Sequence, residues 1–313
     1  QRARGRPNCT GLYSVAGRSL VSNERIIVCG ADGQLGRELQ LTQPPGIEAV
    51  PFNRHALDIT DATAVEGALV TTGARAIINA AAYTAVDRAE SDMETARVIN
   101  ATGPAILADC CAAHGARLLH VSTDFVFDGA SGQAYRPDDE ANPLGVYGAS
   151  KLAGEQAVLA SGADAIVVRT GWVYSRHGGN FVKTMLRLMA ERDRLTVVED
   201  QVGTPTWARG LAQTCWTLTL EPKAHGVYHW SDTGACSWYD FALAIHALAL
   251  ELGLLSAAVA VEPIPAADYP TPAKRPAFSV LDKQRTRALL GYAGRPWRQQ
   301  LGLMLADLKA TQD

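Results

Sequence analysis

The sequence lacks the features that would assign it to a membrane, to nucleic acid or to the outside of the cell. No apolar run reaches the ~18 residues that a membrane-spanning helix needs. The net charge is −3, which gives no overall basic surface for a nucleic acid polymer. The six cysteines show neither a Cys-x-x-Cys motif nor the spacing of an extracellular disulfide framework. We therefore expect a reduced, cytoplasmic protein that binds neither membranes nor nucleic acid.

Metal-binding patterns are equally scarce among the seven histidines. His225 and His229 are four residues apart, but they flank strand-like sequence, and no third candidate ligand lies close to them in the chain. We expect no metal site at this pair.

The first 24 residues also lack the apolar segment that a secretory signal requires. Their charged side chains are four arginines against one acid, Glu24. We expect residues 1–24 to be an extension that takes no part in the fold.

What the sequence does contain is an alternation of short apolar runs with helical stretches from residue 25 onward. The hydrophobic share of 47% and the charged share of 19% are typical of a globular enzyme. Amphipathic helical patterns cover residues 86–114 and 150–159. The apolar runs are rich in β-branched residues and lie at 25–29, 47–52, 76–80, 117–122 and 165–170. This alternation predicts an α/β fold with a doubly wound parallel sheet of the Rossmann type.

The pattern changes after Trp172. Five prolines fall within residues 261–276, too many for a regular helix or a central strand. Residues 208–219 and 226–230, however, again have the patterns of a helix and a strand of the sheet. We therefore expect a dinucleotide-binding domain and a smaller, loop-rich substrate-binding lobe, formed by residues 25–171 with 207–229 and by residues 172–206 with 230–313.

A glycine-rich turn follows the first predicted strand. Gly30, Gly33 and Gly36 recur at every third position, and helical sequence follows them. Glycines at such a turn let the backbone approach a pyrophosphate, whose charge the helix N-terminus stabilises. The position directly after a first strand favours a dinucleotide site over an ordinary turn.

The loop after the second predicted strand bears on the choice between NADH and NADPH. A site for NADH usually places an acid there to bind the ribose 2′-hydroxyl. This chain has Asn53 and Arg54 instead, so Arg54 is available to pair with the 2′-phosphate of NADPH; the alternative is a solvated arginine. Asp58 follows closely and is placed to reach the adenine. We expect NADPH as the preferred cofactor, with some use of NADH.

Small and hydroxyl-bearing residues follow the third and fourth predicted strands. Ala81 and Ala82 let a cofactor lie flat against the chain, and Thr84 adds a hydroxyl. Thr123 and Asp124 end the fourth strand, and open α/β sheets bind ligands at the carboxyl ends of their strands. The alternative for Thr123 is a buried hydroxyl bonded to the backbone.

Tyr147 and Lys151 lie four residues apart in a helical stretch, so one helix face carries both. An ammonium beside a phenol favours the phenolate and lowers the tyrosine pKa from its ordinary value of about 10. A phenol tuned in this way can exchange a proton with a substrate oxygen near neutral pH. The alternative is two unrelated side chains on a helix surface.

Six segments together resemble the dTDP-4-dehydrorhamnose reductase family: GADGQLG, NAAAYTAVDRAE, STDFVFDG, YGASKLAGE, RTGWVYS and YPTPAKRPAFSVLD. The resemblance covers about residues 25–308. The spacing of the glycines matches the variant typical of extended short-chain dehydrogenases. The resemblance implies NADPH-dependent reduction of the C4 ketone of dTDP-4-dehydro-6-deoxy-L-mannose to dTDP-L-rhamnose.

The resemblance also implies catalytic and cofactor-binding roles. Thr123 orients the substrate oxygen, Tyr147 donates its proton, and Lys151 holds the nicotinamide ribose while lowering the tyrosine pKa. The implied cofactor contacts fall on Gly33, Gln34, Leu35, Asp58, Ile59, Ala81, Ala82, Thr84, Tyr147 and Lys151.

Substrate contacts are implied at Thr123, Asp124 and Trp172. Arg275 is implied as a partner for the diphosphate of the sugar nucleotide, because its planar fork can bond two phosphate oxygens at once. For Trp172 the alternative is a core aromatic residue at a domain boundary.

The chain departs from the family pattern in two places. Phe125 follows Asp124 where the family usually has tyrosine. Some members hold magnesium at a dimer interface; Glu38 and Asp307 match two of those positions, but Arg209 occupies the third. A guanidinium repels the ion, which argues against the metal and against the dimer that it holds. The chain is expected to be a monomer or a homodimer.

Two other functions are compatible with parts of the pattern. One is a sugar-nucleotide epimerase or 4,6-dehydratase, but dehydratases generally place glutamate where this chain has Phe125, which has no acid–base capacity. The other is a non-catalytic regulatory subunit, since the methionine adenosyltransferase β subunit resembles these reductases and keeps the tyrosine–lysine pair. The segment YPTPAKRP favours the reductase.

Overall fold

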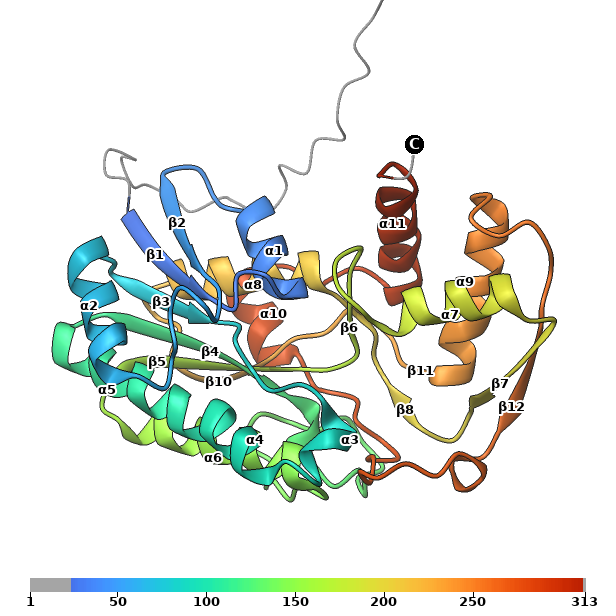
Figure 1. The fold of residues 1–313 in the computed structure, drawn as a ribbon, viewed down its shortest axis with the longest axis horizontal. Helices are drawn as coiled ribbons and strands as arrows, with labels where there is room; N and C mark the ends of the chain where they lie inside the picture. The colour runs from blue at the N-terminus through green and yellow to red at the C-terminus, as the bar shows by residue number, and fades with distance from the viewer. Residues whose placement is uncertain (1–23, 312–313) are drawn as a thin grey trace, which may run out of the picture.

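The computed structural model describes residues 24–311, which form a parallel β-sheet between layers of helices and a smaller lobe beside it (Figure 1). The strand order in the sheet is β10-β5-β4-β3-β1-β2, and all neighbours are parallel. The predicted α/β fold is confirmed. The strands are β1 (Glu24–Cys29), β2 (Ile47–Phe52), β3 (Ala76–Asn79), β4 (Arg117–Thr123), β5 (Asp164–Thr170) and β10 (Gly226–His229).

Alternate residues of the central strands face opposite layers of helices. Ile26 and Val28 of β1 pack in a cluster with α1 (Gln34–Leu41) and α8 (Ala208–Leu220). Ile27 and Cys29 pack on the other face. The helices there are α2 (Ala62–Thr72), α5 (Gly103–His114) and α6 (Val146–Ala160). Burial of the strands on both faces explains why their sequences are continuously apolar.

The predicted extension lies outside the described residues except for its last member. Glu24 is the first residue of β1, where it pairs in register with Ile47 and forms an ion pair with Arg75 at 2.9 Å. Assigning Glu24 to the extension was therefore wrong. A charged residue at a strand end gives no apolar signal, although the backbone there already joins the sheet.

The long amphipathic pattern over residues 86–114 is not one helix. It is divided into α3 (Val86–Ala89), α4 (Met93–Arg97), a π-helical turn (Val98–Thr102) and α5. Single π-helical turns occur often at functional sites, and this one lies beside the candidate active site described below.

The smaller lobe has a core of its own around Phe241, Ile245 and Leu305. Its short strands pair only two at a time, and Pro263 lies in one such pair rather than in the main sheet. The lobe elements are β6 (Val173–Tyr174), α7 (Phe181–Glu191), β7 (Arg194–Val198), β8 (Val202–Gly203), β9 (Thr206–Trp207), β11 (Cys236–Ser237), α9 (Trp238–Glu251), β12 (Ala260–Ile264) and α11 (Trp297–Lys309).

The separate cores support the proposed division into a cofactor domain and a discontinuous lobe, whose bounds stay a prediction. Helix α10 (Gln284–Leu290) contacts β10 and α8, so the segment after the prolines returns to the sheet before α11. Short 3₁₀ helices span Asp124–Val126 and Ala266–Asp268. None of the helices in the described range has the length and apolar character needed to cross a membrane.

Candidate active site

A large cavity lies at the carboxyl ends of β1, β2 and β3. Strand β1 has β2 on one side and β3 on the other, so the strand order reverses here, which is where open α/β sheets bind ligands. The cavity volume is about 900 Å³. The predicted cofactor contacts that line it are Gly30, Gly33, Asn53, Arg54, Asp58, Ile59, Ala81, Ala82 and Thr84.

The glycine-rich turn forms one wall of this cavity. Gly30 has φ +77°, and a Cβ there would lie 2.7 Å from the backbone nitrogen of Ala81. A Cβ on Gly36 would clash with the carbonyl oxygen of Gly30. Gly33 precedes α1, and no side chain caps that helix end. The first N–H groups of α1 therefore remain available to a phosphate.

Three of the predicted cofactor contacts on α1 do not line the cavity. Leu35 is buried in the core, and Gly36 serves the close packing described above. The Gln34 side chain turns toward the lobe, where its Oε1 accepts hydrogen bonds from Asn180 Nδ2 at 2.9 Å and Ser175 Oγ at 3.1 Å. Motif spacing identified the turn correctly but could not give the directions of these side chains.

The loop after β2 presents Arg54 to solvent at the cavity edge. Asn53 builds this loop, because its Oδ1 accepts the N–H groups of His55 and Ala56 at 3.0 and 3.1 Å. Arg54 is exposed and has no carboxylate partner within the described part of the chain. Hydrogen bonds from Thr60 lower the pKa of Asp58, which therefore carries its charge at neutral pH.

Thr123 and Tyr147 meet at the carboxyl end of β4. Burial raises the pKa of Tyr147 to about 12, a hydrogen bond with Thr123 partly offsets this, and the charge of Asp124 raises the pKa further. The Phe125 ring contacts the Tyr147 ring edge-on, with centroids 5.5 Å apart. The phenol is therefore held protonated at neutral pH, contrary to the expectation of a lowered pKa.

Lys151 does not supply the expected effect on the tyrosine. Its side chain is 1% exposed. Its Nζ donates to the carbonyl oxygen of Val121 at 2.7 Å and lies 3.2 Å from Nε2 of His120. Burial lowers the pKa of Lys151 to about 8. The long side chain extends to these two partners on β4. A spacing of four residues from Tyr147 does not predict such contacts.

His120 and Asn79 continue this buried network and were missed by sequence reasoning. Nδ2 of Asn79 lies 3.0 Å from Nδ1 of His120, and Oδ1 of Asn79 accepts the N–H of Ala81 at 3.0 Å. Burial is the main reason why the pKa of His120 lies well below its ordinary value, and the charge of Lys151 lowers it further. The network joins the cavity wall at Ala81 to Lys151. The signal in the sequence that could have identified His120 and Asn79 was the presence of polar side chains within otherwise apolar strands, β3 and β4.

Asn100, on the π-helical turn, is a second missed residue. It is fully buried. Its Oδ1 accepts the N–H of Tyr83 at 2.8 Å, and its Nδ2 donates to the Tyr83 carbonyl and to Ser150 Oγ at 3.1 Å each. Ser150 in turn donates to the carbonyl of Tyr147 at 2.8 Å. Asn100 thus fixes the cavity wall relative to the helix that carries Tyr147.

Asp124 is only 2% exposed, so little of its surface is open to a substrate. Its side chain is in contact with Gly171, where a Cβ would lie 2.5 Å from the carboxylate. Burial raises its pKa to about 6, and hydrogen bonds with Ser279 and Thr123 offset part of this rise. Asp124 therefore joins the strand end to two segments of the second half of the chain.

Trp172 lies where the sheet domain passes into the lobe, and its backbone has the unusual φ of +51°. Its indole stacks on Trp238 with centroids 3.4 Å apart and fits against Gly203. Trp238 also lines a second cavity of about 520 Å³, with apolar walls that include Leu188 and Val197. A strained backbone held in place by stacking is typical of a functional position.

Arg275 lines this second cavity, but its guanidinium already has a partner. NH1 and NH2 bond both carboxylate oxygens of Asp87 at 3.0 and 2.8 Å. The pair connects α3 to the proline-rich segment. The two terminal nitrogens of Arg275 that would grip two phosphate oxygens are therefore paired with Asp87 in this structure.

The residues considered for metal binding are otherwise engaged. Arg209 lies between two acids, donating to Glu38 Oε2 and to Asp307 Oδ2 at 2.8 Å each. His229 is buried against the Tyr135 carbonyl, and His225 bonds its own loop. Across residues 24–311 no three candidate ligands come together.

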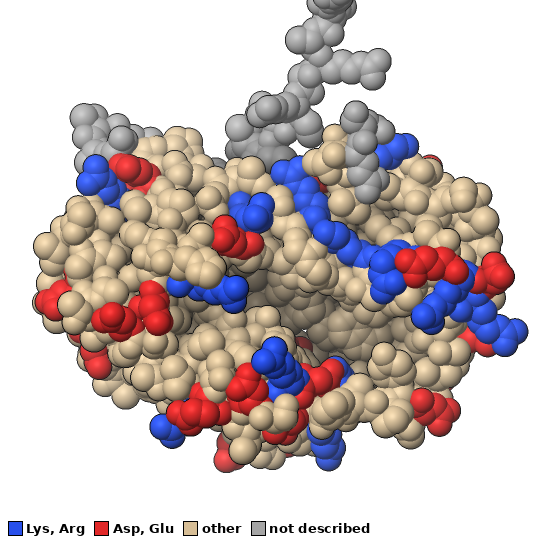
Figure 2. All heavy atoms as spheres, viewed as in Figure 1, with Lys and Arg blue, Asp and Glu red and all other residues tan. Residues whose placement is uncertain are grey.

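The surface between the sheet domain and the lobe is hollowed, and both basic and acidic side chains border its rim (Figure 2).

Comparisons with known proteins agree with this geometry. The family model described as "RmlD substrate binding domain" matches residues 24–310. The dTDP-4-dehydrorhamnose reductase of Mycobacterium tuberculosis is 43% identical over 93% of this chain and 94% of its own. That of Aggregatibacter actinomycetemcomitans is 40% identical over 88% and 97%. The Bacillus anthracis reductase, solved with NADP, is 37% identical with a TM-score of 0.86, over 91% of this chain and 99% of its own.

Proposed function

This chain belongs to the family of dTDP-4-dehydrorhamnose reductases, and we propose that its site reduces the C4 ketone of dTDP-4-dehydro-6-deoxy-L-mannose to give dTDP-L-rhamnose. The protein is an NADP-dependent oxidoreductase. NADPH, when bound, supplies the hydride. The roles of individual residues that follow are our proposal, argued from their contacts.

The cavity at the ends of β1 to β3 fits a dinucleotide. Gly30 and Gly33 line it, and the uncapped start of α1 offers N–H groups to the pyrophosphate. Ala81 and Ala82 give a flat wall without side chains that obstruct a ring. Arg54, exposed and free of carboxylates, would hold the 2′-phosphate.

Tyr147 donates the proton that the reduced C4 oxygen requires. A proton donor must keep its proton until the alkoxide forms, and a phenol whose pKa burial raises to about 12 does so at neutral pH. Thr123 orients the same oxygen, because its hydroxyl lies beside the Tyr147 phenol. This hydroxyl also donates to Asp124 Oδ1 at 3.1 Å and accepts the backbone N–H of Phe125 at 3.2 Å.

Lys151 holds the nicotinamide ribose in this proposal. In the structure its ammonium is kept beside the Val121 carbonyl and His120. The network through His120 and Asn79 to the N–H of Ala81 would therefore couple the position of Lys151 to the cavity wall.

The second cavity, beside the Trp172–Trp238 stack, would bind the nucleotide of the substrate. Its apolar walls suit a base. Trp172 stacks on Trp238, which lines this cavity, and it follows closely after Thr170, the register partner of Thr123. This arrangement would place the sugar toward Tyr147. We further propose that the protein acts in the cytoplasm; the five cysteines of the described part are all free, as a reducing compartment favours.

The observation that carries the proposal is the position of the partly buried Tyr147 phenol beside Thr123 at the carboxyl end of β4, on the edge of the sheet where the cofactor cavity also lies. The test is to follow NADPH absorbance after adding dTDP-4-dehydrorhamnose and to identify the product by NMR. We expect stoichiometric oxidation and dTDP-L-rhamnose. Unchanged absorbance with a folded enzyme would refute the proposal, and a C4-epimeric product would correct its stereochemistry.

A further inference from the structure

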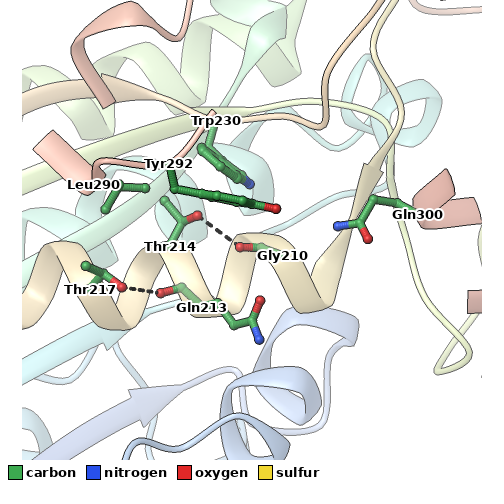
Figure 3. Close-up of a pocket in the computed structure, with 8 residues that line it drawn as sticks. All are labelled: Gly210, Gln213, Thr214, Thr217, Trp230, Leu290, Tyr292 and Gln300. Atoms are coloured by element: carbon green, nitrogen blue, oxygen red, sulfur yellow. Dashed lines mark hydrogen bonds between the residues drawn. The ribbon is translucent and has the colours of Figure 1, made fainter. Parts of the chain in front are cut away.

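A small cavity of about 20 Å³ lies apart from both large cavities, between α8 and the segments that follow β10 (Figure 3). Figure 3 shows the Gln300 amide and the Trp230 indole directed toward the side of α8 that carries Gly210. Gly210, Trp230 and Gln300 are among the residues that line the cavity.

Two buried polar atoms beside this cavity lack hydrogen-bond partners within the described part of the chain. They are Nε1 of Trp230 and Oδ1 of Asp232. The two residues are only 2% and 1% exposed. Burial raises the pKa of Asp232 to about 7, and hydrogen bonds with the Trp207 backbone and the Gln300 side chain offset part of that rise. Buried groups without partners are costly, and native proteins pair nearly all of them with protein atoms or ordered water.

These groups converge on one point beside α8. This point is where a Cβ of residue 210 would lie if it were not glycine. A Cβ on Gly210 would be 3.3 Å from Gln300 Nε2, 3.6 Å from Asp232 Oδ1 and 3.9 Å from Trp230 Nε1. A glycine inside a helix lowers helix stability relative to alanine. Its presence at this position therefore leaves room that these three polar groups share.

We infer that a single water molecule is bound there as a permanent part of the fold. The water accepts the N–H of Trp230 and an N–H of Gln300, and it donates to Oδ1 of Asp232. Two N–H donors make the point unsuitable for a metal cation, and the carboxylate makes it unsuitable for an anion. A molecule that both donates and accepts fits all three groups, and the volume is sufficient for one water.

The bound water supports the substrate side of the active site indirectly. The other carboxylate oxygen of Asp232 accepts the N–H of Trp207 at 3.0 Å. The neighbouring Thr206 donates its hydroxyl to the Gly171 carbonyl at 2.6 Å and its N–H to the Trp172 carbonyl at 3.1 Å. The water thus completes the hydrogen bonds of the Asp232 carboxylate, which bonds strand β9, and β9 in turn bonds the backbone of Gly171 and Trp172.

The substitution Gly210→Ala tests this inference, with Gly67→Ala as its matched control. Gly67 lies in α2, is exposed, and a Cβ there would meet nothing within 4 Å. Helix propensity alone should raise Tm in both variants by about 1–3 °C. If the water is present, the Gly210→Ala methyl displaces it and leaves Trp230 and Asp232 without partners, so Tm falls by several degrees. A rise equal to that of Gly67→Ala would show that the cavity is empty and overturn the inference.

A crystal structure of the unmodified protein gives an independent result should the variant fail to fold. We expect one density peak within hydrogen-bond distance of Trp230 Nε1, Asp232 Oδ1 and Gln300 Nε2. An empty cavity, or a peak with the short contacts of a metal ion, would contradict the inference.

Discussion

The cofactor domain and the substrate lobe build their cavities in different ways. In the cofactor domain part of the wall is backbone with small side chains or none, at Gly30 and Gly33 in the turn after β1 and at Ala81 after β3. In the lobe the walls are side chains brought together from distant segments, such as Trp172 stacked on Trp238. Backbone sites leave short local motifs in a sequence, whereas side-chain sites leave almost none.

The proposed catalytic residues share features of both regions. Their spacing singled out Tyr147 and Lys151, but the pKa values of the two side chains depend on burial and on partners outside their helix. The substitutions below test whether the two regions can be perturbed separately.

The largest effect is expected at Tyr147. Tyr147→Phe keeps the ring but removes the proton donor, so kcat should fall at least ~10²-fold. The KM for either substrate should change little, since neither cavity is altered. Tyr228→Phe, on the edge strand β10, is the control and should keep full activity. A Tyr147→Phe enzyme that retains more than about a tenth of kcat would assign the proton to another group.

The pH dependence tests the state of Lys151. Its pKa is lowered to about 8 by burial, so the free enzyme loses this charge as pH rises above about 8. If the charged form holds the ribose, kcat/KM for NADPH falls up to about tenfold per pH unit above that value.

Lys283 provides the matched control for this profile, because burial also lowers its pKa to about 8. Lys283→Met should keep the alkaline decline, whereas Lys151→Arg, which stays charged, should lose it. A decline that disappears in Lys283→Met instead would remove Lys151 from the explanation.

Trp172→Ala should affect the lobe alone. Loss of the stack on Trp238 is expected to raise KM for the sugar nucleotide by up to about tenfold, while KM for NADPH stays the same. Trp172→Phe, which keeps an aromatic ring, should lose less. Equal increases in both KM values would mean that the two regions are coupled through this residue.

Arg54→Ala should affect the cofactor domain alone, and more weakly. A charge-assisted bond to the 2′-phosphate at an exposed site contributes about 1 kcal/mol, or roughly fivefold in affinity. KM for NADPH should therefore rise several-fold and KM for NADH remain nearly unchanged. Equal losses with both cofactors would indicate that Arg54 shapes the loop instead of reading the phosphate.

Chelation should have no effect. Arg209 bonds both Glu38 and Asp307, which leaves these acids unsuited to a divalent ion. Activity and solution mass should be the same before and after EDTA. Dissociation of a dimer on chelation, reversed by magnesium, would contradict this prediction.

The sequence was most informative where structure follows from local composition. The five apolar runs marked their strands to within about a residue because strands buried on both faces are apolar throughout. The break in residues 86–114 was not predicted, since Asn100 bonds the Tyr83 backbone across 17 positions and reads as an ordinary polar residue. Arg275 was predicted to bind the diphosphate of the sugar nucleotide, and its pairing with Asp87, 188 positions away, gave no signal in the sequence.

The side-chain direction of Lys151 also depends on contacts with residues distant in the sequence, although Lys151 is only one helix turn from Tyr147. Helical spacing places it on the face of Tyr147, but its acceptors are the Val121 carbonyl and His120 on β4. The contacts and the pKa of Lys151 depend on tertiary burial and could not be predicted from this spacing.

Hydride transfer to C4 of the sugar is the central claim, and isotopic labelling tests it most directly. The reaction is run with two samples of NADPH, each carrying deuterium at C4 of the nicotinamide but on opposite faces of the ring. NMR of the sugar nucleotide should then show deuterium at C4 of dTDP-L-rhamnose with one of the two labels. Product that carries no deuterium at C4 with either label, or deuterium at another carbon, would contradict the account.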